Sequence, residues 1–379
     1  MQIKDNSYME NNNNVKFRIL NLNSIDSKPT FKEAKNGDYI EYGTDNAYPQ
    51  YLLDVFHNKS NKHKAIISKK VDMTTGSGFK KVESASAISF IENRYGKDDL
   101  EYVAKRVNYD YEIHNGFAMF IRWNSSGTKI AAIDWLPYHK CRLSSDEKSI
   151  LVSKDWTNIR KKVNKPVSYP RFNPMTSDKE PTQVFYYVEE SNGVDYYPLP
   201  YYSSTLNWIE LDWEISTFHL SSVRNGFSAG FILNFATGIP TEEEMDLAYK
   251  AFNRKYTGSN NAGKFILTYS EGQDQKPDLT PIELNSSDER FMLLHSEMLT
   301  EILIGHSVTS PMLFGVRTEG QLGGRNEILE ALAIFQSTYI DNKQKTIEKA
   351  FNKLARYSDV TEKLELGKYS IDFSNIENS

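Results

Sequence analysis

Apolar residues recur at three- and four-residue steps over two long stretches near the C-terminal end of the sequence, which predicts two helices. The first runs from Ser286 to about His306 and opens with the S-x-x-E pattern of a capping box. The second runs through Asn326–Arg356 and would be roughly 46 Å long at the helical rise. Pro311 ends the first pattern, and the intervening Leu313–Arg325 carries four glycines. We therefore expect conformationally free backbone held between two helices.

The first half of the chain mixes the helical period with the strand period. Helical spacing covers three segments: Asn46–Phe56, Asn61–Met73 and residues 98–114. After Gly116 the pattern changes to apolar or alternating runs between turn residues, which predicts four strands: Phe117–Trp123, Ile130–Leu136, Ile150–Val152 and Gln183–Val188. Residues 1–14 end in an asparagine run and are expected to be disordered.

A small α/β module is predicted between the two halves. Leu206 to about Asn225 is helical, with its apolar residues on one side. Four shorter elements follow: strand Phe231–Phe235, helix Thr241–Tyr256, strand Lys264–Tyr269 and strand Leu279–Leu284. The helix opens with a second capping box, formed by Thr241 and Glu244. With 379 residues, the fold class is predicted to be α+β with more than one subdomain.

Net charge, cysteine count and the lengths of the apolar runs argue against several classes of protein. The chain has 45 basic and 50 acidic residues, so its formal charge of −5 lacks the global basic signature of a duplex-binding protein. Its single cysteine, Cys141, excludes an internal disulfide and indicates a reducing compartment. We expect Cys141 to be a small, partly buried side chain and not a nucleophile. The sequence has no run of 18 apolar residues and begins with a polar segment, so neither a membrane span nor a secretion signal is expected.

Two near-motifs resemble catalytic or nucleotide sites but occur in the wrong context. Gly258–Phe265 nearly spells the phosphate-binding loop, but Phe265 replaces the hydroxyl residue and a strand, not a helix, should follow. Ser228 lies in a G-x-S-x-G pattern that is preceded by a helix and followed by a strand, the reverse of a nucleophile elbow. The seven histidines lack metal-binding spacing. We therefore expect no catalytic residue, cofactor or metal; the alternative is a hydrolase or nucleotide-binding enzyme that uses Ser228 or the Gly258–Lys264 loop.

The order of several landmarks resembles the portal proteins of tailed bacteriophages, the rings through which double-stranded DNA enters and leaves the capsid. The most specific landmark is Ile302–Glu327, an apolar helix followed by Pro-x-x-Phe-Gly, a glycine loop and Asn-Glu. Four earlier landmarks occur in the same order: Asp45–Leu52 with Asn61–Ile67, Gly76–Phe79, Asn115–Ala118 and Trp135–Pro137. The resemblance covers about residues 40–356, mostly as an order of elements.

The resemblance implies a role for each segment. After a flexible N-terminal region (1–40), it implies a wing (41–205), a stem helix (206–228), a clip (229–285), a second stem helix (286–306), a tunnel loop (307–325), a long helix (326–358) and a short C-terminal tail (359–379). The tunnel loop would face DNA through Arg317, Thr318, Glu319, Gly320, Gln321, Gly323, Gly324 and Arg325. The clip would dock the packaging motor through Lys250, Arg254, Lys255 and Lys264, although a solvated helix face also explains these lysines and arginines.

The resemblance also implies partners and location. The chain would form a homo-oligomeric ring, usually a dodecamer, that contacts the terminase large subunit, a head-tail adaptor and the major capsid or scaffold protein. Double-stranded DNA would pass through its channel without a cofactor, and the protein would be assembled in the host cytoplasm into the virion. A different structural head protein, or a monomeric peptide-binding module, is the remaining alternative.

Overall fold

The computed structural model describes residues 16–17, 29–175, 180–224, 231–235, 241, 243–247, 265–269, 287–315 and 325–371. It has the α+β fold class predicted from the sequence. The chain divides into two compact units, which are described separately. The larger unit, here called the body, comprises Lys28–Glu210 and Ser296–Ser379, and the small unit comprises Met1–Ser27 and Leu211–His295.

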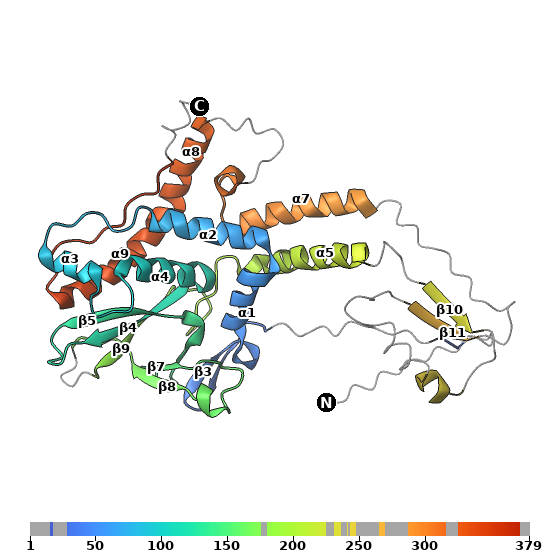
Figure 1. Ribbon diagram of the computed structural model, residues 1–379, viewed down its shortest axis with the longest axis horizontal. Helices are drawn as coiled ribbons and strands as arrows, with labels where there is room; N and C mark the ends of the chain where they lie inside the picture. Colours follow the sequence, from blue (N-terminus) through green and yellow to red (C-terminus); the bar gives the residue numbers. More distant parts are fainter. Residues whose placement is uncertain are drawn as a thin grey trace. The chain divides into compact units, whose positions relative to one another are not determined.

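The body is built around a three-stranded antiparallel sheet with the order β5-β4-β9. Its strands are β4 (Gly116–Trp123), β5 (Ile130–Leu136) and β9 (Thr182–Val188). Helix α4 (Leu100–His114) packs against β4 and β5, on the face of the sheet where α3 (Ala85–Glu92) and α9 (Asp341–Ala355) also lie (Figure 1). The three strands and α4 agree with the sequence prediction, because each carries a long periodic apolar pattern.

Besides α4, the described part of the first half of the body has three α-helices, and side chains cap the starts of two of them. The helices are α1 (Tyr48–Asp54), which continues into a π turn (Val55–Lys59), α2 (Asn61–Thr75) and α3 (Ala85–Glu92). The side chains of Ser60, Ser84 and Asp99 accept backbone N–H bonds at the starts of α2, α3 and α4. Helix α3 is too short for a clear periodic pattern, and the sequence prediction missed it.

A second antiparallel sheet and a hairpin complete the body. The sheet has the order β6-β7-β8, and its strands are β6 (Cys141–Leu143), β7 (Ser149–Val152) and β8 (Val167–Pro170). The hairpin joins β2 (Glu33–Asn36) to β3 (Tyr39–Tyr42). Of these five strands only β7 was predicted, because it contains the apolar run Ile150–Val152, whereas the others include polar residues in their three or four positions.

The predicted long C-terminal helix is present but is not a uniform α-helix. It consists of α8 (Arg325–Phe335), a π turn η8 (Gln336–Ile340) and α9 (Asp341–Ala355), and a 3₁₀ turn (Arg356–Ser358) follows. The apolar face of α9 joins α4, β4 and the residues after Ser358 in one core, to which Phe351 and Leu354 contribute fully buried side chains. Burial of one such side chain contributes about 1.5–3 kcal/mol.

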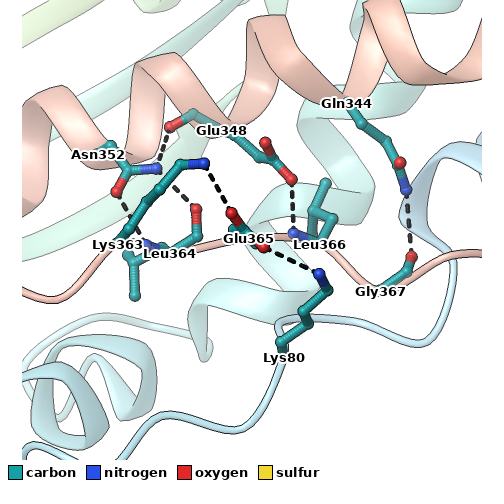
Figure 2. A network of polar contacts seen from close by, with 9 residues as sticks. All are labelled: Lys80, Gln344, Glu348, Asn352, Lys363, Leu364, Glu365, Leu366 and Gly367. Carbon is teal, nitrogen blue, oxygen red and sulfur yellow. Dashed lines mark hydrogen bonds and ion pairs between the residues drawn. The ribbon is translucent and has the colours of Figure 1, made fainter.

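Residues 360–367, here called the strap, run beside α9 in extended conformation (Figure 2). Gln344, Glu348 and Asn352 lie one turn apart on α9 and bond the strap backbone. Asn352 accepts from the Leu364 N–H at 2.9 Å and donates to the Leu364 carbonyl at 2.7 Å. Glu348 accepts from the Leu366 N–H at 2.7 Å, and Gln344 donates to the Gly367 carbonyl at 3.1 Å. Side chains thus satisfy backbone groups that a neighbouring strand would otherwise satisfy.

The opposite side of the strap is attached to the segment between α2 and α3. Glu365 pairs with Lys80 at 2.8 Å and with Lys363 at 2.6 Å (Figure 2). Gly76 passes so close to the strap that a Cβ there would lie 1.8 Å from the Gly367 carbonyl oxygen. Only glycine fits at position 76, which also has φ +57°.

The small unit contains a sheet with the order β1-β11-β10. β10 (Phe231–Phe235) pairs in parallel with β11 (Phe265–Tyr269), and β1 (Lys16–Phe17) pairs antiparallel with β11. Residues 243–247 between the two parallel strands are helical. The predicted capping box is confirmed, since Thr241 N–H donates to the Glu244 carboxylate at 3.0 Å and Glu244 N–H donates to the Thr241 hydroxyl at 3.4 Å.

Two longer helices, α5 (Leu206–Arg224) and α7 (Ser287–Gly305), each include residues of both units and match their predicted positions. Some predictions fall outside the described residues: the disorder of residues 1–14, the strand Leu279–Leu284, most of the helix Thr241–Tyr256 and the cap at Ser286. Among the described residues, no helix is both long and apolar enough to cross a membrane.

Candidate functional site

The candidate site is the glycine-rich segment between α7 and α8, and the structure describes its two ends. At the first end, a 3₁₀ turn (Pro311–Phe314) is followed by Gly315 with φ +80°. At the second end, Arg325 is the first residue of α8. The other predicted DNA-facing residues lie outside the described residues: Arg317, Thr318, Glu319, Gly320, Gln321, Gly323 and Gly324. The four residues predicted to dock the motor, Lys250, Arg254, Lys255 and Lys264, lie outside them as well.

One apolar cluster holds both ends of the segment. Leu313 from the first end packs with Leu332 and Phe335 from α8, and all three are buried. The ring of Phe314 meets the ring of Phe335 edge-on with centroids 5.6 Å apart, and Phe335 stacks on Tyr339 at 5.2 Å. Because both ends belong to one packed cluster, the segment starts and finishes at a fixed place in the body.

At the end of α7, the backbone of Gly305 packs directly against the side chain of Thr205. A Cβ at Gly305 would lie 1.7 Å from the Thr205 hydroxyl oxygen, so only glycine fits there without movement. After Gly305 the chain turns sharply, with Ser307 at φ +54° and its N–H bonded to the Ile304 carbonyl at 2.8 Å. The turn brings His306 into the interior, where it is 2% exposed.

A group of buried polar side chains surrounds this turn and is here called the polar cluster: His63, Lys70, Glu112, His306, Tyr339 and Lys343. All except Tyr339, which is partly buried, are less than 9% exposed. They come from α2, α4, the turn after α7, the π turn and α9, so the cluster joins five elements of the body.

Lys70 is the residue of the polar cluster that contacts the α7 turn most directly. Its ammonium donates to the His306 carbonyl at 2.6 Å and lies 4.0 Å from the centre of the Tyr339 ring. A cation at the C-terminal end of a helix satisfies an orphan carbonyl and complements the helix dipole. Burial, with the nearby Lys343 charge, lowers the pKa of Lys70 to about 8, while Glu112 opposes this shift.

The remaining contacts of the polar cluster connect α4 to α9. The Tyr339 hydroxyl donates to the Glu112 carboxylate at 2.7 Å, and the Lys343 ammonium lies 3.9 Å from the other Glu112 oxygen. Lys343 also lies 3.5 Å from the centre of the Tyr111 ring. Burial lowers the pKa of Lys343. The Glu112 charge therefore acts on two buried ammonium groups, of which only Lys343 pairs with it, and both ammonium groups also lie over aromatic rings.

The two histidines of the polar cluster are neutral at pH 7. His63 Nδ1 and His306 Nε2 are 2.9 Å apart, a distance that requires one nitrogen to donate and the other to accept. Burial, followed by the Lys70 charge, lowers the pKa of His63 to about 3 and that of His306 well below its ordinary value. No Ser, Thr or Cys side chain in the described part of the chain is hydrogen-bonded to the two imidazole rings, so we assign the pair a structural role in joining α2 to the turn after α7. Among the described residues, no three His, Cys, Asp or Glu side chains group as a metal site.

The early landmark at Asp45–Leu52 surrounds a second buried cation, Arg142, which is fully buried. The guanidinium donates to the Asn46 side chain, to the Asn46 carbonyl at 2.7 Å, to Gln50 at 3.3 Å, and to the carbonyls of His139 and Cys141 at 3.1 and 2.7 Å. Asn46 adopts φ +55°, a conformation that asparagine tolerates well. The landmark therefore holds a buried guanidinium, which gives it a structural role.

The other landmarks and Cys141 also have structural explanations. Asn115 ends α4 with φ +62°, and a Cβ on Gly116 would lie 2.8 Å from the Tyr138 ring. Trp135 donates its indole N–H to Asp110 at 2.7 Å. Cys141 is 1% exposed, and burial raises the pKa of its thiol, which agrees with the prediction that it is not a nucleophile.

The context of the two near-motifs agrees with their rejection as catalytic sites. Helix α5 ends at Arg224, and the next described element is β10, which begins at Phe231. The Gly258–Lys264 loop directly precedes β11. Neither motif has the strand-then-helix context that its chemistry requires. The motif residues themselves, except Phe265, lie outside the described residues.

The sequence reading missed the polar cluster. Its signal was present: Lys70 follows His63 and Ile66 at helical spacing, and Lys343 precedes Ile347 by four residues. A lysine on the apolar stripe of an amphipathic helix is a candidate for burial, whereas a lysine elsewhere on the helix is not.

Comparisons with known proteins give a match in structure only. Neither protein-family models nor curated protein sequences match the chain at a significant level. One solved structure, described as the neck of an empty GTA particle computed with C6 symmetry, has a chain with TM-score 0.53 and 12% identity. The virion of the native gene transfer agent (GTA) particle gives 0.52 and 12%, and the neck of the native GTA particle computed with C12 symmetry gives 0.52 and 9%. Each match covers 87% of this chain and 86% of the other, so this chain has the fold of a chain in these particles.

Proposed function

We propose that this protein is a portal-type subunit, a structural component of a phage-like head-tail junction that closes into a ring around a DNA channel. The observation that carries the proposal is the fold shared over 87% of the chain with a chain in particle necks whose descriptions name sixfold and twelvefold symmetry. The portal landmarks, which occur in the same order along the sequence, support it independently.

The proposed ring has about twelve copies and no chemistry of its own. A formal charge of −5 per chain gives such a ring −60, which disfavours tight binding of phosphates that must slide through it. In this proposal a separate terminase motor docks on the clip during packaging, head-tail adaptors replace it later, and the protein resides at the portal vertex of the virion.

Within the ring, we assign DNA contact to the glycine-rich segment, at residues 317–321 and 323–325. Its two ends are fixed by Leu313, Phe335 and the Lys70–His306 bond, while its composition is rich in glycine and nearly balanced in charge. Such a segment suits loose, reversible contact with a moving backbone.

The ring is tested by measuring the mass of the purified full chain over a range of concentrations, with imaging of the largest species. Twelve copies of a 43.6 kDa chain would weigh roughly 520 kDa and show a central hole. A chain that stays monomeric at every concentration, and also in the presence of its scaffold and capsid proteins, would refute the ring.

The loop assignment has a separate test. Replacing Gly323 and Gly324 together with leucine should reduce DNA packaging while ring assembly persists, because side chains at these positions would restrict the backbone near DNA. A matched control replaces Gly127 and Gly193, which lie in open space in the body, with asparagine. Packaging at the normal level by the loop variant would reject the assignment.

A further inference from the structure

The connection between β7 and β8 is strongly basic and exposed. Residues 153–166, here called the basic loop, contain five basic side chains and one acidic side chain, although the whole chain has a formal charge of −5. All five basic side chains are exposed, and four of them, Arg160, Lys161, Lys162 and Lys165, lie within six positions. The basic loop lies outside the glycine-rich segment, to which the proposed function assigns DNA contact, and outside the clip, to which it assigns motor docking.

The backbone of the basic loop is fixed by a hydrogen-bond network of its own. The Ser153 hydroxyl donates to the Asn164 carbonyl at 2.6 Å and so joins the two ends of the loop. The Asn164 side chain donates to the Asn158 carbonyl at 3.1 Å, and the Lys161 N–H donates to the same carbonyl at 3.1 Å. The four cations therefore project from a held backbone, which lowers the entropy lost when they bind.

Buried side chains anchor the loop to the second sheet. Trp156 is 3% exposed, donates its indole N–H to the Lys140 carbonyl at 2.8 Å, and lies 4.9 Å from the Arg142 guanidinium. Asp155, the one acidic residue, accepts bonds from Thr157 and Asn158. Its carboxylate shapes the loop and forms no ion pair with the four exposed cations.

Among the described residues, none of the four exposed cations forms an ion pair. Most charged side chains that only solubilise a protein alternate with the opposite sign, whereas these four repel one another at close range. Their arrangement lowers the cost of binding a partner that brings several negative charges at regular spacing.

The composition of the loop favours phosphates over an acidic protein surface. Protein interfaces have apolar or aromatic centres and are depleted in lysine, but the exposed basic and apolar side chains of the basic loop are four lysines, one arginine and a single apolar residue, Val163. Contacts to the nucleic-acid backbone are made by lysine, arginine, asparagine and threonine. Asn158 and Thr157 are exposed beside the cations.

We propose that the basic loop binds the phosphate backbone of double-stranded DNA without sequence preference, through Arg160, Lys161, Lys162 and Lys165. The contact is separate from the glycine-rich segment and does not require a ring, because one chain presents all four cations. Four phosphate contacts would give a slope of log affinity against log salt concentration of about −3.6.

The test measures binding of the full-length protein to a fluorescent 30-base-pair duplex of random sequence by anisotropy, at NaCl concentrations from 50 to 200 mM. The wild-type affinity should fall by about 100-fold over this range. A variant with Arg160→Gln, Lys161→Gln, Lys162→Gln and Lys165→Gln should bind at least about tenfold more weakly at 50 mM and show a slope near zero. Unchanged far-UV circular dichroism and melting temperature would establish that the variant is folded.

The matched control replaces four scattered exposed lysines, Lys64, Lys97, Lys345 and Lys349, with glutamine and removes the same net charge. It should keep most of the wild-type affinity. Equal loss in the control and the loop variant, equal duplex binding by wild type and loop variant, or no duplex binding at 50 mM would each overturn the proposal. Loop-dependent binding of poly-L-glutamate without binding of the duplex would overturn it in favour of an acidic protein partner. All outcomes are independent of whether a ring forms.

Discussion

Two places in the body bury cationic side chains, and their hydrogen bonding differs. Arg142 donates to the oxygens of four residues, and no carboxylate is among its partners. In the polar cluster, Lys70 makes one hydrogen bond and Lys343 makes only a 3.9 Å ion pair, and both depend on aromatic faces and on the shared Glu112.

The difference shows how a guanidinium and an ammonium tolerate burial. A planar guanidinium can be satisfied by fixed carbonyls, and it keeps its charge because its pKa, although lowered by burial, begins very high. An ammonium in a similar place has a pKa that reaches about 8 for Lys70. Arg142 therefore stays charged at any pH at which the protein is folded. The charge of Lys70 in the polar cluster depends on pH and on the groups around it.

The largest effect is expected from Arg142→Met. Removing the guanidinium takes a donor from five oxygens on four residues, of which the Asn46 side chain and the His139 carbonyl keep a second donor, so the free energy of unfolding should fall by on the order of 4 kcal/mol. Urea denaturation followed by circular dichroism measures this change. Arg94→Met, at an exposed arginine paired with Glu92, is the control and should change stability by less than about 1 kcal/mol. Equal effects of the two substitutions would show that burial of Arg142 contributes nothing to stability.

Acidification should destabilise the polar cluster next. The pKa of His63 is about 3 in the folded chain and 6.5 in the unfolded chain, so the unfolded chain binds the extra proton as pH falls below 6.5. Stability is lost between these values, by about 2 kcal/mol from His63 at pH 5. The measurement is the free energy of unfolding at pH 7 and pH 5, in wild type and in His63→Gln.

The variant should lose less stability on acidification than the wild type. Comparing the two isolates His63 from other groups that titrate in this range, including His114, His139 and His306, whose pKa values burial also lowers. Asp110 has the opposite effect on stability. Burial raises its pKa to about 7, so on acidification the folded chain binds this proton before the unfolded chain does, and stability increases. An identical pH dependence in the two proteins would contradict the buried, neutral state of His63.

The smallest effects come from the two lysines of the polar cluster, and they should differ. Lys70→Met leaves the His306 carbonyl without its donor and should cost about 2 kcal/mol. Lys343→Met removes a desolvated charge that has no close hydrogen bond and should change stability by less than about 1 kcal/mol in either direction. Thermal unfolding of both variants at pH 7 provides the comparison. A larger loss for Lys343→Met would mean that its ion pair with Glu112 is stronger than the 3.9 Å distance indicates.

Long periodic elements of this fold could be predicted from the sequence, and contacts made by single side chains could not. α2, α4, β4, β5 and α5 have enough turns or alternations for the period to be unambiguous. The strap shows no clear period, and its backbone is held on one side by α9 side chains and on the other by an antiparallel bridge between Leu366 and Phe79. The sequence predicts the helix that contains α9, but it does not show that side chains of α9 bind the backbone of the strap.

The candidate site was predicted in outline. The sequence located the glycine-rich segment and its flanking helices, and the structure describes both of its ends. The polar cluster that holds the first end could not be derived, since it joins residues more than 200 positions apart, such as His63 and His306. The assignment of DNA contact to the segment, and of motor docking to the clip, remains a prediction.

The π turn at Gln336–Ile340 determines which way the side chains of α8 point relative to those of α9. Besides Phe335, the buried residues there are Leu332, Gln336 and Ile340, which are spaced four positions apart, and a plain α-helix would carry each of these steps about 40° past the last. The wider turn absorbs one extra residue and returns the row to the interior. Losing a single residue from this stretch would swing α8 by about 100° relative to α9. The second end of the glycine-rich segment would then leave from a different side of the helix, although every contact of α9 was intact.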